Sequence, residues 1–369
     1  MKNYLVTGAA GFIGSHFVKY LLEQEQDIFI VILDKLTYAG NLHNIKEVLE
    51  KKDKVRFIPG DICDTDLMES IFSDYDIDYI VNFAAESHVD KSITQAKIFL
   101  ETNLMGVQNI MDCAKKSWMI GKDDKGYPVY KEGKKFLQIS TDEVYGSLEK
   151  DLPEGRIFTL EEGLFKDRKE RICYGNRFFT ENSPLQPSSP YSASKAAADM
   201  LVSAYFETYH FPMNITRCSN NYGPCQFPEK LIPLTINHVL EGKKIPIYGD
   251  GMQVRDWLYV EDHCKAIYLV LKYAKYGEIY NIGGVQEKTN VEIVSLILEQ
   301  ISKIQGTEKK DYLLEYVEDR LGHDRRYAIY PKKMVQELGW FPETSFETGM
   351  QKTIQYFIQK NPYSKEIML

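Results

Sequence analysis

Short apolar runs alternate with amphipathic stretches through the first half of the chain. Five runs are rich in β-branched and aromatic residues and are bounded by Gly, Asp or other polar residues: Tyr4–Thr7, Ile28–Leu33, Val55–Pro59, Tyr79–Ala85 and Phe136–Ser140. Runs that are apolar throughout, rather than at every second position, are typical of strands buried on both faces of a parallel sheet. They predict five strands of one such sheet.

Helical periodicity fills the intervals between these runs. In the first interval, residues one helical turn apart share an apolar face: Gly14, Phe17, Val18, Leu21 and Leu22. Two longer segments carry the same period, and they cover Ser92–Lys116 and Ser192–Tyr209. Strands that alternate with helices predict an α/β fold with a doubly wound parallel sheet.

The rhythm changes twice along the chain. Residues 147–190 are rich in charge, Gly and Pro and predict a long surface excursion near the mouth of the site. Beyond Tyr222, Gly- and Pro-rich segments separate shorter elements, which predicts a smaller C-terminal α/β lobe. We therefore expect a first domain over 1–217 and a substrate lobe over 218–369, with part of 250–275 returning to the first domain.

Composition narrows the class of protein. The 369 residues carry a net charge of −8, which argues against general binding to nucleic acid or anionic membranes. The chain begins directly in a strand, and no apolar run approaches the roughly 20 residues that span a bilayer. The six cysteines show no ligand-like spacing with histidines, so we expect no metal site and a cytoplasmic protein.

A glycine motif marks the first turn. Gly8, Gly11 and Gly14 follow the first predicted strand and open the first predicted helix. The first glycine permits a tight turn, the second lets the backbone approach a pyrophosphate, and the third allows close packing of helix and strand. Phosphates would meet the free N–H groups at the helix start. The motif predicts an NAD-binding, Rossmann-type domain.

Acidic residues at the ends of the next strands refine the cofactor. Asp34 can accept hydrogen bonds from ribose hydroxyls and would repel a 2′-phosphate, which favours NAD over NADP although Lys35 follows. Asp61 and Ile62 end the third strand, where they can meet the adenine. An equally plausible interpretation makes Asp61 a helix N-cap.

Tyr191 and Lys195 lie one helical turn apart on the same face. The phenol can serve as a base for an alcohol only if its pKa falls well below about 10, and an ammonium and a positively charged nicotinamide both favour phenolate. Thr141 supplies a hydroxyl that can orient a sugar oxygen. The alternative is a packing aromatic and a solvated lysine.

Asp142 and Glu143 follow the fifth predicted strand directly. Two neighbouring carboxyls can hold different protonation states near neutral pH in a crowded, desolvated site, and so can act as acid and base. A simple alcohol dehydrogenase has no need of such a pair. The alternative is two polar residues that merely follow a strand.

Long segments of the chain resemble a known family. They are Thr7–Gly14, Asp34–Asn41, Ala84–Asp90, Ser140–Gly146, Ser189–Lys195, Cys218–Pro233, Arg255–His263 and Gly322–Ala328. They resemble the extended short-chain dehydrogenases/reductases and, among them, the dTDP-glucose 4,6-dehydratases. The chain departs from that pattern in the length of the 147–190 excursion and at Leu321, where a proline is customary.

The resemblance implies a three-part reaction on the sugar. Tyr191 takes the proton of the 4-hydroxyl while a hydride leaves C4 for NAD. Glu143 then removes the C5 proton and Asp142 protonates the departing 6-hydroxyl. Hydride returns to C6, and the product is a 4-keto-6-deoxy sugar.

The resemblance, together with the motifs, also implies the binding residues. The catalytic set is Thr141, Asp142, Glu143, Tyr191 and Lys195. For the cofactor, the set is Gly8, Gly11, Phe12, Ile13, Gly14, Asp34, Lys35, Thr37, Asp61, Ile62, Ala84, Ala85, Ser87, Thr102, Tyr191 and Lys195. For the sugar nucleotide, it is Ser87, His88, Thr141, Asn220, Lys230, Leu231, Pro246, Tyr248, Arg255, Asn290, Asp319, Arg320 and His323, with His88 more a structural neighbour than a catalyst.

Other functions remain open at this point. UDP-glucose differs from dTDP-glucose at the base by one methyl contact, worth only about 1–3 kcal/mol. A nucleotide-sugar 4-epimerase or decarboxylase shares the fold, but it does not use an Asp-Glu pair for elimination. A non-catalytic NAD-binding scaffold would not need the proton-moving groups. The family resemblance further implies a homodimer formed through the two long helices.

Overall fold

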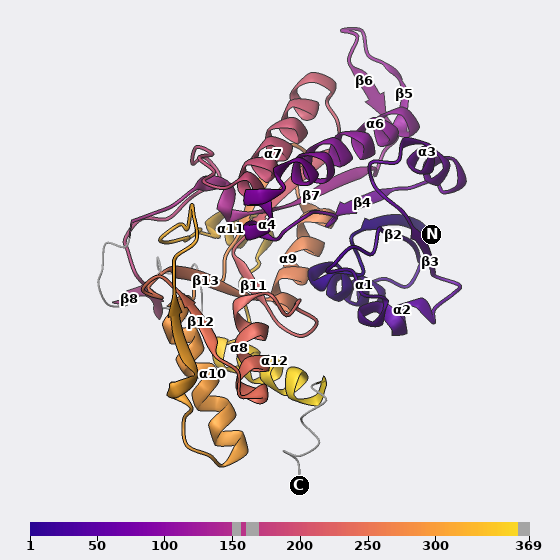
Figure 1. Ribbon diagram of the computed structural model, residues 1–369. Helices are drawn as coiled ribbons and strands as arrows, with labels where there is room; N and C mark the ends of the chain where they lie inside the picture. Colours follow the sequence, from indigo (N-terminus) through magenta and orange to yellow (C-terminus); the bar gives the residue numbers. More distant parts are fainter. Residues whose placement is uncertain (150–155, 160–169, 361–369) are drawn as a thin grey trace.

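Seven parallel strands form the central sheet of the computed structural model, which describes residues 1–149, 156–159 and 170–360 (Figure 1). Their order is β14-β10-β7-β4-β1-β2-β3. The bounds are β1 Lys2–Thr7, β2 Ile28–Asp34, β3 Val55–Pro59, β4 Tyr79–Asn82, β7 Lys135–Thr141, β10 Met213–Cys218 and β14 Ile279–Ile282. The five predicted strands are confirmed, and β10 and β14 extend the sheet beyond β7.

Alternate residues of one strand enter two different cores. In β2, Ile30 and Ile32 pack into the core on one face of the sheet, whereas Val31 and Leu33 pack into the core on the other. All four are fully buried. Burial on both faces is the reason that these strands are apolar throughout.

Helices cover both faces of the sheet. One face carries α1 (Phe12–Gln24), η1 (Leu42–Ile45), α2 (Lys46–Leu49), α9 (Val260–Tyr273) and α11 (Lys332–Leu338). The other carries α3 (Thr65–Asp74), α6 (Gly106–Trp118) and α7 (Pro190–Tyr209). The predicted doubly wound α/β architecture is therefore confirmed.

The prediction of one continuous helix over 92–116 is wrong. The segment consists of α4 (Val89–Thr94), α5 (Ala96–Leu100), the π-helical η2 (Glu101–Met105) and α6. Gln95 leaves the helical conformation, with φ −133° and ψ 44°, and separates α4 from α5. The helical spacing of apolar residues does not reveal such a local break, because apolar residues are buried both before and after Gln95.

A smaller C-terminal lobe lies below and to the left of the sheet in Figure 1. Its strands are β11 (Asn220–Tyr222), β12 (Ile245–Tyr248), β13 (Val254–Tyr259), β15 (Glu287–Thr289) and β16 (Leu314–Val317). The helices are α8 (Leu231–Glu241), α10 (Asn290–Gln305), η4 (Asp311–Leu313) and α12 (Phe346–Lys360), and they share their own apolar core. The predicted domain boundary at residue 217 stays a prediction. Not every element after it belongs to the C-terminal lobe, since β14 and α9 pack with the large sheet.

Two antiparallel hairpins lie outside these sheets. The first, β5 (Met119–Lys122) with β6 (Pro128–Tyr130), projects at the top of Figure 1. The second, β8 (Arg156–Thr159) with β9 (Glu170–Cys173), belongs to the predicted excursion over 147–190. Residues 150–155 and 160–169 of that excursion lie outside the described residues. No helix within the described ranges is long and apolar enough to cross a membrane.

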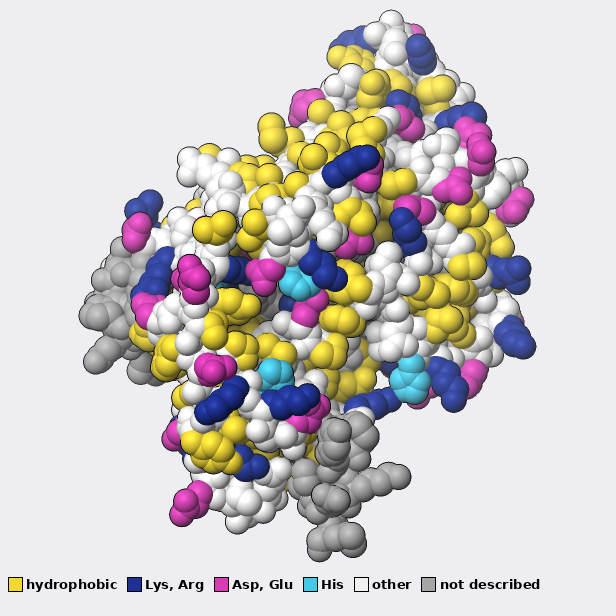
Figure 2. Space-filling view, viewed as in Figure 1, with side chains coloured by type: hydrophobic (Ala, Val, Ile, Leu, Met, Phe, Trp, Pro, Cys, Tyr) yellow, Lys and Arg dark blue, Asp and Glu magenta, His cyan; other side chains and the backbone are white. Residues whose placement is uncertain are grey.

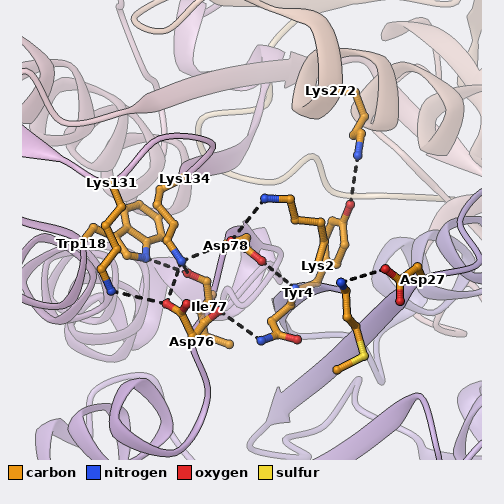
Figure 3. Close-up of polar contacts among 12 residues, drawn as sticks. Lys2, Tyr4, Asp27, Asp76, Ile77, Asp78, Trp118, Lys131, Lys134 and Lys272 are labelled. Atoms are coloured by element: carbon orange, nitrogen blue, oxygen red, sulfur yellow. Dashed lines mark hydrogen bonds and ion pairs between the residues drawn. The ribbon is translucent and has the colours of Figure 1, made fainter.

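A polar cluster closes the amino-terminal edge of the sheet (Figure 3). The buried Lys134 places its Nζ 2.8 Å from Asp76 Oδ1, 2.9 Å from the Ile77 carbonyl and 3.2 Å from Asp78 Oδ1. Trp118 donates its indole N–H to the same Ile77 carbonyl at 2.8 Å. These contacts are internal and structural. Open α/β sheets bind ligands at the opposite edge, where the strands have their carboxyl ends, and the candidate site lies there.

Candidate active site

The glycine turn after β1 opens into a cleft of about 1600 Å³, part of it open to solvent. A Cβ atom on Gly8 would lie 2.6 Å from the Ala84 nitrogen, and one on Gly14 would lie 2.6 Å from the Gly8 carbonyl oxygen. Only glycine fits either position. Gly11 is the N-cap of α1 and offers no side chain to its first N–H groups, which leaves them for an anion such as a pyrophosphate.

Carboxylates shape the rim at the ends of β2 and β3. Asp34 accepts the N–H groups of Ala10 and Leu36, one on each oxygen and both at 2.8 Å, so each oxygen keeps room for a further donor such as a ribose hydroxyl. Asp61 Oδ2 lies 2.6 Å from Lys35 Nζ. The lysine is therefore neutralised by Asp61, and the rim as a whole disfavours a 2′-phosphate.

The structure excludes one of the two interpretations of Asp61. The N-cap of α3 is Asp64, whose side chain accepts the N–H of Leu67 at 3.0 Å. Asp61 instead accepts the N–H of Cys63 and pairs with Lys35. The N-cap interpretation of Asp61 is therefore wrong for α3.

Every residue predicted to hold the cofactor lines this one cleft. They come from six separate segments: Gly8, Gly11, Phe12, Ile13, Gly14, Asp34, Lys35, Thr37, Asp61, Ile62, Ala84, Ala85, Ser87, Thr102, Tyr191 and Lys195. The glycine cradle, the free helix start and the acidic rim fit a dinucleotide. The residues themselves therefore suit the predicted group.

A buried asparagine that the sequence reasoning missed holds two of these segments together. Asn103, in the π-helical turn next to Thr102, accepts the N–H of Glu86 at 2.8 Å. It donates to the Glu86 carbonyl at 3.0 Å and to Ser194 Oγ on α7 at 2.9 Å. The widened turn thus fixes the loop after β4 against α7. A buried polar residue within an apolar helix period was the available signal.

The turn that follows β7 carries the two carboxyls. Thr141 ends β7 and caps the short 3-10 helix η3 (Asp142–Tyr145), because its Oγ1 accepts the N–H of Glu143 at 3.3 Å. Asp142 is 1% exposed, and its Oδ2 has no hydrogen-bond partner among the described residues. Glu143 and Thr141 line the cleft.

The surroundings of these carboxyls favour different protonation states. Burial, reinforced by Glu143 and then Asp256, raises the pKa of Asp142 well above its ordinary value. Burial also raises the pKa of Glu143, but the cations Arg320, Lys230 and Arg255 oppose that rise. Asp142 is therefore the group that keeps its proton, and Glu143 is the readier base.

Tyr191 and Lys195 project from the first turns of α7 into the same cleft. Pro190 at the start of the helix and a capping box between Ser189 and Ser192 set where α7 begins. Lys195 Nζ is buried and donates to the Ile139 carbonyl of β7 at 2.7 Å. This bond fixes the lysine beneath the catalytic turn.

The pKa of the Tyr191 phenol does not follow the prediction. Burial, followed by the Glu143 carboxyl, raises it well above its ordinary value. The pKa of Lys195 is itself lowered by burial, so this lysine does not reverse the effect. The chain alone thus favours the neutral phenol, and any lowering of its pKa must come from a positive charge bound beside it.

The predicted substrate residues fall into two groups. Ser87, Thr141, Asn220 and Lys230 line the cleft. Lys230 Nζ donates to the Ser87 carbonyl at 3.0 Å and so links the C-terminal lobe to the loop after β4. Asn220 keeps a buried Oδ1 that has no partner among the described residues and suits a ligand donor.

The second group does not line this cleft. It comprises His88, Leu231, Pro246, Tyr248, Arg255, Asn290, Asp319, Arg320 and His323. Half-buried Leu231 starts α8 and half-buried Pro246 lies in β12.

Several members of that group gather on the C-terminal lobe. His323 Nδ1 lies 2.6 Å from Asp319 Oδ1, and the Tyr248 ring meets the His323 ring edge-on at 6.5 Å. Gln253 donates to Asp319 Oδ2 at 3.1 Å and accepts the N–H of Asn290 at 3.0 Å. The sequence places these residues far apart, and the fold makes them one cluster.

Two arginines act electrostatically on both this cluster and the catalytic turn. Arg255 is 5% exposed, stacks 4.3 Å from the centre of the Tyr327 ring and donates to the Asp324 carbonyl. Arg320 pairs with Asp90 at 3.4 Å. Both oppose the rise in the pKa of Glu143. Burial, together with both arginines, lowers the pKa of His323 to about 4, so this histidine is neutral near pH 7.

Glu229 is a further residue that the sequence reasoning missed. Its carboxylate lies 3.2 Å from His88 Nε2, 3.4 Å from the Tyr38 hydroxyl and 3.6 Å from Lys230 Nζ. This contact is compatible with a structural role for His88 and does not test its predicted place at the substrate. Charged side chains of both signs gather at the centre of the face in Figure 2, between the sheet domain and the C-terminal lobe.

Comparison with known proteins agrees with this geometry. The family model of the NAD dependent epimerase/dehydratase family matches residues 4–283. The dTDP-glucose 4,6-dehydratase of Shigella flexneri is 45% identical over 364 residues, which cover 98% of this chain and 94% of that protein.

Solved structures are similar over the whole chain. The dTDP-glucose 4,6-dehydratase of Bacillus anthracis, in complex with NAD, is 44% identical, with a TM-score of 0.79 and complete coverage of both chains. That of Streptomyces venezuelae, with NAD and TYD bound, is 39% identical, with a TM-score of 0.82 and 99% coverage of both. The chain therefore belongs to the NAD dependent epimerase/dehydratase family and, within it, to the dTDP-glucose 4,6-dehydratases.

Proposed function

We propose that the chain is a hydro-lyase that converts dTDP-glucose to dTDP-4-keto-6-deoxyglucose. One observation carries the proposal: two adjacent carboxyls, the buried Asp142 and the half-buried Glu143, follow β7 directly, and Glu143 lines the dinucleotide cleft together with Tyr191 and Lys195. Its full-length relatives carry the same activity in their names. The pair distinguishes this reaction from those of same-fold enzymes that only oxidise and reduce.

The cleft holds the cofactor through the chain's own groups. Gly8, Gly11 and the first turn of α1 receive the pyrophosphate, and Asp34 accepts from the adenosine ribose. Lys195 reaches the other ribose from α7. When bound there, NAD would supply the hydride acceptor for C4 and, once reduced, the hydride donor for C6, so that the reaction has no net redox change.

Proton movements fall to the side chains. A positively charged nicotinamide bound beside Tyr191 would favour the phenolate, which then accepts the proton of the 4-hydroxyl as the C4 hydride leaves. Thr141 orients the sugar oxygen. The resulting 4-keto group acidifies the C5 hydrogen, which Glu143 removes. Asp142, held protonated by burial, gives its proton to the 6-hydroxyl, and water leaves as the C5–C6 double bond forms. When hydride returns to C6, Glu143 gives the proton that it took back to C5.

The nucleotide half of the substrate lies toward the C-terminal lobe in this proposal. Asn220, Lys230, Arg255 and Arg320 supply donors and positive charge for the diphosphate, for which arginine is well suited. Ser87 contacts the sugar. The base is received by the residues of the second group: Leu231, Pro246, Tyr248, Asn290, Asp319 and His323.

Three alternatives are compatible with the same fold. UDP-glucose remains a competing substrate, because a single methyl group distinguishes uracil from thymine. A 4-epimerase or decarboxylase would use Tyr191, Lys195 and NAD but would offer no departing hydroxyl for Asp142 to protonate. A non-catalytic scaffold would have no use for the adjacent carboxyls Asp142 and Glu143.

We further propose that the chain forms a homodimer in the cytoplasm. Exposed apolar side chains lie on neighbouring helical segments: Leu100 of α5, Met105 of η2 and Met200 of α7 are 47%, 53% and 65% exposed. These are the segments that the family resemblance assigns to a dimer interface. A second copy would cover these side chains.

Parallel incubation with dTDP-glucose and UDP-glucose tests the function. We expect the dTDP sugar to give a 4-keto-6-deoxy product, and dTDP-glucose labelled with deuterium at C4 to yield product labelled at C6. Loss of the label to solvent, or its retention at C4, would contradict the proposed reaction. Faster turnover of UDP-glucose than of dTDP-glucose would show that the enzyme prefers a uracil base.

A further inference from the structure

A chain of four buried side chains lies behind the catalytic turn. Arg217 donates from Nε to Asp199 Oδ2 at 2.8 Å and from Nη1 to the Tyr145 hydroxyl oxygen at 2.9 Å. Tyr145 in turn donates to Asn281 Oδ1 at 2.8 Å. All four residues are 3% exposed or less, and none of them was predicted to take part in the site. We call them the Tyr145 network.

The fold brings these residues together from four elements. Arg217 of β10 is in register with Ser140 of β7 on one side and with Asn281 of β14 on the other. Tyr145 ends the same short helix that carries Asp142 and Glu143. Asp199 lies on α7 one turn beyond Lys195. The network thus joins the turn of the elimination pair to the helix of the oxidation pair.

The direction of each hydrogen bond is fixed by chemistry. A guanidinium group only donates, so the Tyr145 oxygen must accept from Arg217 and its proton must point to Asn281. Burial raises the pKa of Tyr145 to about 12, so the phenol stays neutral and keeps this donor. The Arg217 guanidinium also lies 4.9 Å from the centre of the Tyr145 ring. Tyr145 is held at both its hydroxyl and its face.

The returning limb of the surface excursion braces the same tyrosine. The Phe179 ring stacks on the Tyr145 ring at 5.0 Å with an interplanar angle of 19°. Asn281 donates its side-chain amide to the Phe179 carbonyl at 3.4 Å, and Glu181 Oε1 accepts the Asn281 backbone N–H at 2.9 Å. The limb therefore contacts two members of the network.

The limb also packs directly on the catalytic turn. Gln186 donates its N–H to the Val144 carbonyl at 3.0 Å. Gly146 has φ 84°, and a Cβ atom there would lie 2.3 Å from the Gln186 carbonyl oxygen. Only glycine permits this approach of two backbones.

We propose that Tyr145 is a positioning residue, which fixes the turn of Asp142 and Glu143 relative to Tyr191 and Lys195, and that residues 179–186 are its brace. The inference rests on the proposed function but concerns residues that do not touch the reacting atoms. Tyr191 and Lys195 project from α7, and Lys195 is held directly by the Ile139 carbonyl. Within the network it is Asp199, not Tyr145, whose charge acts on Lys195. Elimination depends on the turn itself. Loss of the network therefore slows elimination more than oxidation.

The test compares two buried tyrosines. Tyr145→Phe removes one buried hydroxyl from the network. Tyr280→Phe is the matched control, because Tyr280 is also 1% exposed and donates its hydroxyl to Glu337 at 2.8 Å, away from the turn. In Tyr145→Phe we expect unchanged KM, a kcat at least tenfold lower, and transient absorbance at 340 nm that rises and decays slowly. The control should keep both the wild-type kcat and the wild-type transient.

Amide hydrogen exchange supplies a readout that needs no substrate. Exchange over residues 142–146 and 179–186 should accelerate in Tyr145→Phe and in Phe179→Leu, which removes the stacking ring but keeps an apolar side chain. Wild-type exchange in both variants, or equal slowing of oxidation and elimination, would overturn the positioning role. If the wild-type protein made no 4-keto product, the proposed function would fail, while exchange would still decide whether the network holds the turn.

Discussion

Asp142 and Glu143 are adjacent in sequence, yet their side chains have different surroundings. Asp142 is enclosed with further carboxyls, whereas Glu143 faces the cleft under the influence of Arg320, Lys230 and Arg255. Burial raises both pKa values, but the cations hold the pKa of Glu143 low enough for this group to lose its proton more readily. The proposed acid, Asp142, and the proposed base, Glu143, are thus neighbours in sequence.

Glu143→Gln should stop the reaction between oxidation and elimination. The amide keeps the shape of the side chain but cannot take the C5 proton, so product formation should fall by about 10²–10⁴-fold while reduced cofactor accumulates. Absorbance at 340 nm and product analysis measure the two steps separately. Tyr191→Phe should give neither reduced cofactor nor product.

The exposed Glu207→Gln on α7 is the control for that pair of variants and should behave as wild type. Full product formation by Glu143→Gln would show that another group removes the C5 proton.

Asp142→Asn should stabilise the fold more as the pH rises. The raised pKa means that the folded state keeps a proton that the unfolded state loses above its ordinary pKa of about 4. The wild type therefore loses stability with rising pH, from about pH 4 up to the folded-state pKa, by about 1.4 kcal/mol for each pH unit in that window. The asparagine variant lacks this loss.

Melting temperatures measured from pH 5 to pH 8 provide the test. The difference in Tm between Asp142→Asn and wild type should grow with pH, whereas the exposed Asp66→Asn should show no such trend. A constant difference would mean that the Asp142 carboxyl is ionised in the folded protein.

At the scale of elements, the site is made by the ends of strands and the starts of helices. Parallel strands β1, β2, β4, β7 and β10 end at the same edge of the sheet, where α1 and α7 begin. The π-helical η2 adds one irregular turn that places Thr102 in the cleft and Asn103 beneath it. Regular elements set the position of the site, and the irregular turn completes its wall.

Gly14→Ala should weaken cofactor binding by loosening the first turn. The new Cβ atom would lie 2.6 Å from the Gly8 carbonyl oxygen and 2.8 Å from the Ala9 Cα, so α1 must move away from the strand. We expect at least tenfold weaker NAD binding, measured by titration of cofactor-free protein, and destabilisation of about 1–3 kcal/mol.

Gly121→Ala is the matched control, since a Cβ atom there meets nothing within 4 Å. Equal effects of the two substitutions would contradict a steric role for Gly14.

At the scale of the molecule, the site is shared between two lobes. The sheet domain supplies the glycine turn and the groups that move protons, and the C-terminal lobe supplies Arg255, Arg320 and Lys230. The bond from Lys230 to the Ser87 carbonyl and the pair of Arg320 with Asp90 cross between them. Contact between the lobes thus gathers positively charged side chains at the proposed diphosphate site, although the chain as a whole is acidic.

Met200→Glu should disrupt the proposed dimer. A charge in an apolar interface is costly to bury, so sedimentation at micromolar protein should shift from dimer to monomer. Ile304→Glu, at an exposed site at the end of α10, should leave the dimer intact. A monomeric wild type would remove the proposal.

The sequence by itself determined the features that depend on short-range patterns. Apolar runs predicted the parallel strands because burial on both faces excludes polar residues. The glycine spacing predicted the turn because a side chain cannot fit at Gly8 or Gly14. The predicted cofactor residues all line the cleft, since the ends of neighbouring parallel strands meet at one edge.

The tertiary structure alone decided what depends on distant neighbours. The break at Gln95, the roles of Asn103 and Glu229, and the clustering of Tyr248, Asp319 and His323 could not be read from local periodicity. Nor could the direction of the Tyr191 pKa shift, which follows from burial and from a carboxyl on another element. Electrostatics and packing act through space, so the groups that tune the site become visible only once the chain is folded.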